Sequence, residues 1–197
     1  MLSDGYNQLG SSMKNHIKRV VILATIALLA AACGDEIGPV ERPTAGVSPQ
    51  ATEGLDLRVA TTAESILQAI NVQRAEQGVP ALISQPVLVD LALARSTDLA
   101  VRSYLGHADP ETGDVKIESA LAELGYSGPA AELIFASGHP LESVPERAAT
   151  AWFRDPMHKA LLLEPTFMYG GIGIMGDGES WKITMVLTVD LPQEALP

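Results

Sequence analysis

The chain has 197 residues and carries 24 acidic residues against 13 basic ones, a net charge of −11 with histidines neutral. Nucleic-acid binding depends on Lys and Arg side chains that neutralise phosphates, so this charge argues against a nucleic-acid partner. Apolar residues make up 47% of the chain, which is enough to bury a core of its own.

The N-terminal part has the layout of a secretion signal. Three basic residues precede an apolar stretch at residues 20–32, which only Thr25 interrupts. A bilayer-spanning helix needs about 20 apolar residues, so this shorter stretch suits the apolar core of a signal peptide. We therefore expect residues 1–32 to be a signal peptide, with translation starting at Met13 because residues 1–12 lack both charge and apolar character.

Cys33 is the only cysteine, so no disulfide can form within the chain. Small residues at 30–32 run directly into it, which resembles a bacterial lipobox, where the cysteine is acylated and becomes the mature N-terminus. An exposed thiol is seldom left unpaired outside the cell, although a free thiol after an ordinary cleavage site is the alternative. We expect a lipidated Cys33 to anchor the exported chain at the bacterial cell membrane or outer membrane.

The mature chain is more acidic than the whole. Removing residues 1–32 takes away three of 13 basic and one of 24 acidic residues, leaving 10 and 23 and a net charge of −13. This charge opposes adsorption to anionic lipid, so membrane attachment would depend on Cys33. Residues 33–61 are rich in Gly, Pro, Thr and Ser and predict a disordered tether. Residues 62–191 predict a single domain, and 192–197 a C-terminal tail.

Apolar residues at spacings of three and four predict helices in the first part of this domain. The expected helices are 62–77, 86–104, 115–124, 145–154 and 157–163. After Pro165 the pattern changes to alternation, and Gly176-Asp177-Gly178-Glu179 supplies a turn, so 169–189 predicts a β-hairpin. A short strand is expected at 132–136. Helices followed by a terminal antiparallel hairpin predict an α+β fold.

Three side chains from distant segments are the candidate site. His107 follows the second expected helix, Glu132 begins the short strand, and His158 opens the last helix. His139 stands in a Gly-Pro turn and is expected to be solvated. Trp152 and Trp181 are expected in the core. Two imidazoles and a carboxylate so far apart can form a site only if the fold gathers them.

Six short motifs follow one another in an order that resembles a known family. They are Asn71-Val72-Gln73-Arg74 with Gly78-Val79-Pro80-Ala81-Leu82, Gly106-His107, Leu124-Gly125-Tyr126, Ala131-Glu132-Leu133-Ile134, Ala151-Trp152-Phe153-Arg154-Asp155-Pro156-Met157-His158, and Gly171-Ile172-Gly173-Ile174. This order is similar to that of the CAP superfamily (cysteine-rich secretory proteins, antigen 5, pathogenesis-related 1), in its cysteine-poor bacterial SCP-like extracellular branch. The resemblance covers about residues 66–189.

The resemblance implies an α-β-α sandwich with a cleft that carries two histidines and one or two acids. By motif these are His107, His158 and Glu132, with Asp155 as the second acid. The family's Gly-Glu-Asn is Ala-Glu-Leu here, so one polar side chain at the edge of the cleft is missing. Two imidazoles with carboxylate oxygens would suit Zn²⁺ or a similar divalent ion. Alternatively, Glu132 orients the histidines by hydrogen bonds and no metal is held.

Three functions stay open at this level. The first is a surface-tethered binding module whose cleft takes a small apolar or cell-envelope ligand, as the resemblance permits. The second is a metal-dependent hydrolase of peptide or envelope material, with His107, His158 and Glu132 as metal ligands. The third is a structural or adhesive surface protein. The chain has neither the tight spacing of a metalloprotease helix nor a Ser or Cys nucleophile framed by a motif, and proteolysis is not a general property of the family it resembles, so we favour the non-catalytic binding module.

Overall fold

A computed structural model of the chain describes residues 49–192, with side chains from residue 53 onward. The elements follow in the order α1 (Pro49–Glu76), β1 (Ile83–Ser84), α2 (Pro86–Val101), α3 (Lys116–Glu123), β2 (Ala130–Ser137), η1 (Leu141–Ser143), α4 (Val144–Arg154), α5 (Pro156–Leu162), β3 (Tyr169–Gly176) and β4 (Trp181–Thr188). The expected α+β class and terminal hairpin are confirmed. The expected signal peptide, Cys33 and residues 193–197 lie outside the described residues.

The four strands form one sheet in the order β1-β3-β4-β2. Strands β3 and β4 pair along their full length as an antiparallel hairpin, and β2 pairs antiparallel with the far side of β4. The two-residue strand β1 pairs with β3 in parallel only at Tyr169 and Gly170. Beyond Gly170, therefore, no described strand pairs with the outer edge of β3.

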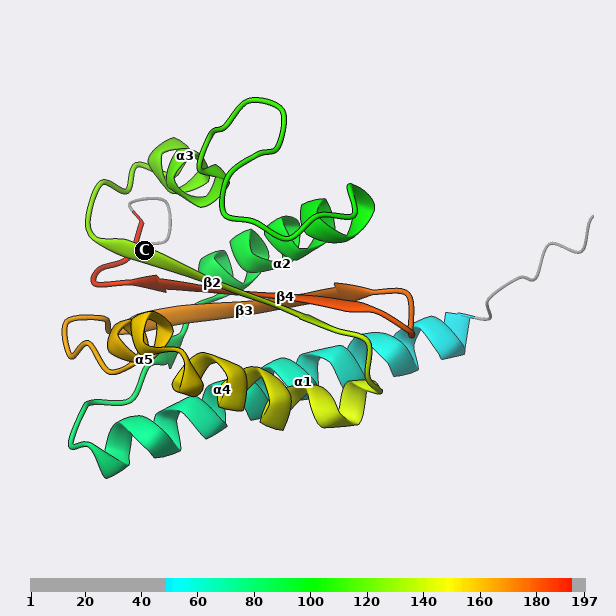
Figure 1. The fold of residues 1–197 in the computed structure, drawn as a ribbon, viewed down its shortest axis with the longest axis horizontal. Helices are drawn as coiled ribbons and strands as arrows, with labels where there is room; N and C mark the ends of the chain where they lie inside the picture. Colours follow the sequence, from blue (N-terminus) through cyan, green and yellow to red (C-terminus); the bar gives the residue numbers. More distant parts are fainter. Residues whose placement is uncertain (1–48, 193–197) are drawn as a thin grey trace, which may run out of the picture. The chain divides into compact units, whose positions relative to one another are not determined.

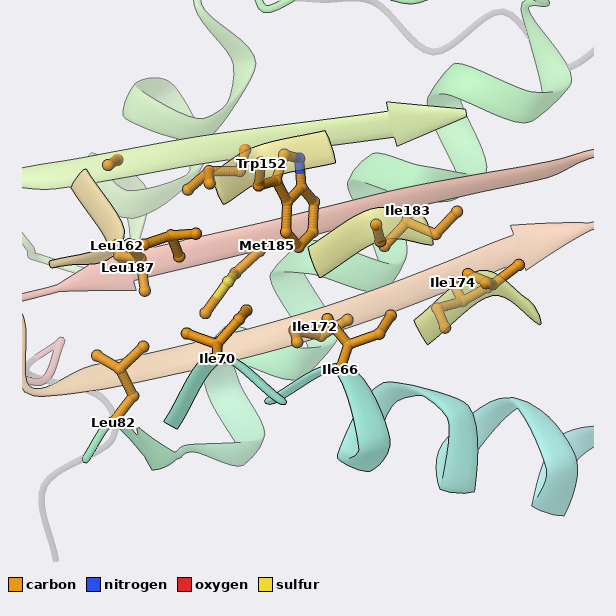
Figure 2. Close-up of a cluster of buried hydrophobic side chains, with 14 of the residues drawn as sticks. Ile66, Ile70, Leu82, Trp152, Leu162, Ile172, Ile174, Ile183, Met185 and Leu187 are labelled. Atoms are coloured by element: carbon orange, nitrogen blue, oxygen red, sulfur yellow. The ribbon is translucent and has the colours of Figure 1, made fainter. Parts of the chain in front are cut away.

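Helices cover the sheet on both faces, which makes three layers (Figure 1). Helices α1, α4 and α5 lie on one face, and α2 and α3 lie on the other. The larger core belongs to the first face, where Trp152 of α4 packs among Ile66 and Ile70 of α1 and the inward-facing residues of β3 and β4 (Figure 2). The smaller core joins Leu88 and other apolar side chains of α2 and α3 to the second face.

Helix α1 begins much earlier than the sequence predicted. We expected a start near residue 62, but the helix runs from Pro49, so residues 49–61 are helical and not tether. Proline fits the first turn of a helix, and Leu55, Val59 and Ile66 continue one face at helical spacing. Val59 packs against the larger core. Tertiary burial of this face outweighs the Gly, Pro and Thr content on which the tether prediction rested.

Two glycines bring α2 unusually close to the sheet. A Cβ on Gly171 would lie 2.1 Å from the carbonyl carbon of Leu88, and a Cβ on Gly173 would lie 2.1 Å from the backbone nitrogen of Leu93. No real side chain fits at such distances, so α2 rests directly on the backbone of β3. This contact sets the height of α2 above the sheet, and with it the position of the loop that carries His107.

Within residues 49–192, no helix is long and apolar enough to cross a membrane.

Candidate functional site

Glu132 is the centre of a buried polar cluster on the α2 face of the sheet. Its neighbours on β2, Ala131 and Leu133, point into the larger core. Because side chains alternate along a strand, Glu132 points to the opposite face. Only 3% of its side chain is exposed, and both carboxylate oxygens have partners. Arg95 Nε donates to Oε1 at 2.7 Å, and His107 Nδ1 lies 2.7 Å from Oε2.

Arg95, on the inner face of α2, connects Glu132 to the loop after the helix. Its guanidinium also donates to Asp98 Oδ2 at 3.0 Å and to the Tyr104 hydroxyl at 2.6 Å. Two further hydrogen bonds go to the carbonyl oxygens of Gly106 and His107. Burial disfavours the charged form of Arg95, but the Glu132 carboxylate and the Tyr104 hydroxyl outweigh it and raise its pKa. The cluster therefore holds a buried ion pair between Arg95 and Glu132.

His107 has the most exposed side chain of this cluster. About half of its side chain is exposed, at 51%. A carboxylate can only accept hydrogen bonds, so Nδ1 carries a hydrogen and donates it to Glu132. This fixes the orientation of the ring. Within residues 53–192, no hydroxyl or thiol hydrogen-bonds to His107, so the pair lacks the nucleophile that an oriented imidazole would activate in acyl transfer.

The second predicted histidine is held by a different partner. His158 lies in the first turn of α5, and its Nδ1 is 3.2 Å from Asp155 Oδ1. Asp155 is the N-cap of α5 and accepts the backbone N–H groups of Met157 and His158, each at 2.9 Å. The hydrogen bond from the His158 backbone is the main reason that the pKa of Asp155 falls below its usual range. Asp155 thus has a capping role here.

His107, Glu132 and His158 do not come together as a metal centre. Among the described residues, no three His, Cys, Asp or Glu side chains lie close enough together to hold a metal ion. Glu132 and His107 meet on the α2 side of the sheet, whereas α5 packs its Leu162 into the core on the other side. Arg95 also already supplies positive charge to Glu132. The donor set as it stands does not fit a divalent ion, and we derive no chemistry through one.

Asp109 caps the loop that follows His107 and also pairs with two basic side chains. Its carboxylate, 4% exposed, accepts the backbone N–H groups of Glu111 and Thr112. Arg102 and Lys116 also contact it, at 2.7 and 2.8 Å. The hydrogen bonds from Arg102 and Lys116 hold the pKa of Asp109 well below its usual range. This cluster fixes the loop between α2 and α3, and therefore the backbone on which His107 stands.

The other sequence predictions near the site have clear outcomes. Trp152 and Trp181 are buried, at 1% and 3% exposure, as expected of core residues. His139 is exposed, which agrees with a solvated turn residue. The sequence analysis missed Arg95 as a member of the cluster. Its position on the otherwise apolar inner face of α2 was the available signal, because a charged residue on a buried face requires a buried partner.

A second candidate region is an apolar groove, which we call the β3-edge groove. It has a volume of about 740 Å³ and lies between α1 and α2, along the edge of β3 that β1 leaves uncovered. Its walls include Leu55, Val59 and Leu67 of α1 and Leu93 of α2, and its floor is the run of β3 from Ile172 to Gly176. None of His107, Glu132, Asp155 and His158 lines this groove.

The groove differs from the His–Glu cluster in chemistry. Its exposed surface is contributed mainly by aliphatic side chains, and Leu55 and Leu93 are each 39% exposed although both are large and apolar. The polar lining is sparse and includes the carboxylates of Asp56 and Glu64 but no basic residue. A concave apolar surface with a few polar groups is the usual form of a ligand site.

Helices on both faces of a small, mainly antiparallel sheet make this domain an α+β sandwich. Two solved structures share this fold. An extracellular protein with an SCP domain from Bacillus anthracis superposes with a TM-score of 0.56 at 19% identity, over 73% of this chain and 44% of that one. An outer surface protein from Borrelia burgdorferi superposes with a TM-score of 0.53 at 16% identity, over 65% and 92%.

The family itself is shown by sequence. The model of CAP, the cysteine-rich secretory protein family, matches residues 67–190, so this chain belongs to the CAP family. The protein YkwD of Bacillus subtilis strain 168 is 24% identical over 150 residues, which are 76% of this chain. This chain spans only 56% of the length of YkwD and 44% of the Bacillus anthracis chain. The expected family membership and its bacterial relatives are confirmed.

Proposed function

We propose that this chain is an exported, non-catalytic binding module, anchored to the bacterial cell surface through acylated Cys33, that holds an apolar ligand of the cell envelope. Two fold relatives are described as an extracellular protein and an outer surface protein, which agrees with an exported domain. The layout of residues 14–33 supports the signal peptide and the acylated cysteine. The ligand site of this proposal is the β3-edge groove and not the His–Glu cluster.

The observation that carries this proposal is the groove itself. Leu55 and Leu93 stay exposed on its walls, although both side chains are large and apolar. When an apolar ligand covers exposed apolar surface, the binding free energy gains roughly 25 cal/mol for each Å² removed from water. A volume near 740 Å³ lies within the range of known small-ligand sites.

The His–Glu cluster supports a structural role better than a catalytic one. Both oxygens of Glu132 are engaged, and Arg95 fills the space on its inner side with permanent positive charge. A general base needs a proton donor within reach, and a catalytic zinc site holds its water with three protein ligands. The hydrolase alternative therefore has no supporting contact in this part of the chain, and metal-independent binding is the simpler function.

Nile red fluorescence tests the groove as the binding site. We expect the chain from Cys33 onward, carrying Cys33→Ser, to bind this apolar dye, and Leu93→Arg to weaken binding at least tenfold. Leu105→Arg is the matched control, because Leu105 is also exposed, at 52%, but lies outside the groove. Equal dye affinity in Leu93→Arg and the unsubstituted chain would refute the groove as the ligand site.

Fractionation tests the anchor. In bacteria that express the full chain, Cys33→Ser is expected to move the protein from the membrane fraction to the soluble exported fraction. Unchanged membrane association of the Ser variant would contradict acylation at this cysteine.

Zinc tests the metal question separately. Added ZnCl₂ should leave the melting temperature unchanged both in the unsubstituted chain and in His107→Ala. A zinc-dependent rise that His107→Ala abolishes would restore the metal hypothesis.

A further inference from the structure

The uncovered edge of β3 offers main-chain hydrogen-bonding groups to the groove. The backbone N–H of Gln85 donates to the carbonyl oxygen of Gly170 at 3.1 Å, where β1 covers the edge. Main-chain groups point alternately to the two edges of a strand, so those of Ile172 and Ile174 point to this same edge. Strand β1 ends before them, and no other described strand lies on that side.

Natural sheets usually protect a strand edge with a charge, a proline or a covering segment, because an open edge pairs with other chains. The run Ile172–Gly176 contains no charged residue and no proline. It instead forms the floor of an apolar groove whose walls are α1 and α2. An extended segment of about five residues, roughly 16 Å long, would match the length of this floor. A segment bound here would therefore pair its main chain with β3 and bury its apolar side chains between α1 and α2.

The charged side chains that line the groove favour one kind of extended segment. Asp56 and Glu64 are both exposed and line the groove, and no lining residue is basic. The mature chain as a whole carries a net charge of −13, from 10 basic and 23 acidic residues. Complementary charge speeds association and disfavours like-charged partners. The groove is therefore suited to a basic segment with apolar side chains between its charges.

We propose that the β3-edge groove binds an extended, basic and apolar peptide segment of another envelope protein, which pairs with Ile172–Gly176 as an added strand. This deepens the proposed function and rests on it, since it names the ligand class for the same groove. Added strands gain affinity from main-chain hydrogen bonds and specificity from pockets for alternate side chains. Leu93 and Leu55 would contact the apolar side chains, and Asp56 and Glu64 would contact the basic ones.

The acidic rim also disfavours two other occupants of the groove. The chain's own residues 33–48 contain three acidic residues and one basic residue, and two prolines that cannot donate to a strand. A second copy of the domain that docked through the same groove would bring its own acidic residues against those of the first copy. Both would meet like charge at Asp56 and Glu64. An acyl chain would satisfy the apolar walls but leave the main-chain groups of Ile172 and Ile174 without a strand partner.

Synthetic peptides test the proposal on the chain from Cys33 onward with Cys33→Ser. We expect the hexapeptide acetyl-Lys-Val-Lys-Val-Lys-Val-amide to bind, with amide NMR shifts centred on residues 172–176. The same peptide with N-methylated alternate amides should bind at least tenfold more weakly, because it cannot donate as a strand. The Asp56→Lys, Glu64→Lys double variant should weaken binding at least tenfold. Glu118→Lys with Glu123→Lys on α3 is the control for the same change in charge.

Each other outcome overturns the proposal. Equal binding of the N-methylated peptide would exclude strand pairing, and equal binding of the Glu-for-Lys peptide would exclude charge selection. Binding of dodecanoate without peptide binding would assign the groove to acyl chains, and a dimer that protects the β3 amides from exchange would assign it to a second copy. Nile red binding with no peptide binding would leave the proposed function standing. Loss of both would reject the proposed function as well.

Discussion

Replacement of Glu132 by Gln tests the role of the buried polar cluster most sharply. The substitution keeps the size and one accepting oxygen of the side chain but removes its charge. Arg95 then stays buried, at 3% side-chain exposure, without the carboxylate that now lies 2.7 Å from its Nε. Removal of one partner from a buried ion pair costs about 3–5 kcal/mol.

The structure places the expected cost at the lower end of this range. Arg95 keeps the carboxylate of Asp98, which is 28% exposed, and the hydroxyl of Tyr104. We therefore expect Glu132→Gln to reduce the free energy of unfolding by about 3 kcal/mol. For a domain of this size that corresponds to a fall of roughly 10 °C in melting temperature. Urea unfolding followed by far-UV circular dichroism measures it, with Glu179→Gln in the exposed hairpin turn as the control.

A double variant distinguishes charge loss from loss of shape. Replacing both partners of a buried pair by uncharged groups costs far less than breaking it. Glu132→Gln with Arg95→Met should thus recover part of the stability lost in Glu132→Gln alone. Two results would show that this cluster is not a structural ion pair. One is a cost below about 1 kcal/mol for Glu132→Gln. The other is a double variant whose loss of stability equals the sum of the losses in the two single variants.

Three further predictions concern stability. Arg74 has no exposed side-chain surface and donates to the carbonyl oxygens of Pro80 after α1, Leu162 at the end of α5, and Glu164 and Phe167 beyond it. Arg74→Met should therefore cost at least about 3 kcal/mol in urea unfolding, and a cost under about 1 kcal/mol would contradict this. Gly173→Ala should destabilise the fold strongly, because its Cβ would lie 2.1 Å from backbone, whereas Gly138→Ala, with its nearest contact at 4.0 Å, should not. The lowered pKa of Asp109 stabilises the fold above the unfolded value near 3.9, and this contribution is lost as pH falls toward the folded value. The drop in urea midpoint from pH 7 to pH 3 should therefore be smaller in Asp109→Asn, and an equal drop would count against the Arg102 and Lys116 contacts.

Much of the fold was predictable because local patterns and tertiary structure agree. The helix that begins at Pro86, the hairpin across Asp177 and the buried Trp152 all follow from periodicity, turn residues and size. Strand β1 could not be foreseen, since two residues carry no periodicity and pair only because α1 and β3 place them together. The early start of α1 at Pro49 depends on packing of Val59 that composition does not reveal.

The candidate site was predictable only in part. The structure places His107 within hydrogen-bond distance of Glu132, and motif order located both residues. His158 does not join them, because Asp155 caps α5 and holds its imidazole locally. The β3-edge groove left no motif in the sequence, since it arises where α1, α2 and a short β1 leave an edge uncovered. A groove formed along an uncovered strand edge can be recognised only in the three-dimensional structure.

The location of the ligand tests the central claim most directly. Amide NMR shifts of the Cys33→Ser chain, recorded as Nile red is added, report which residues meet an apolar ligand. We predict changes along α1 from Leu55 to Leu67 and along Ile172–Gly176 of β3, with His107 and Glu132 unaffected. Shifts that centre on His107 and Glu132 while the β3 edge stays unchanged would contradict the account.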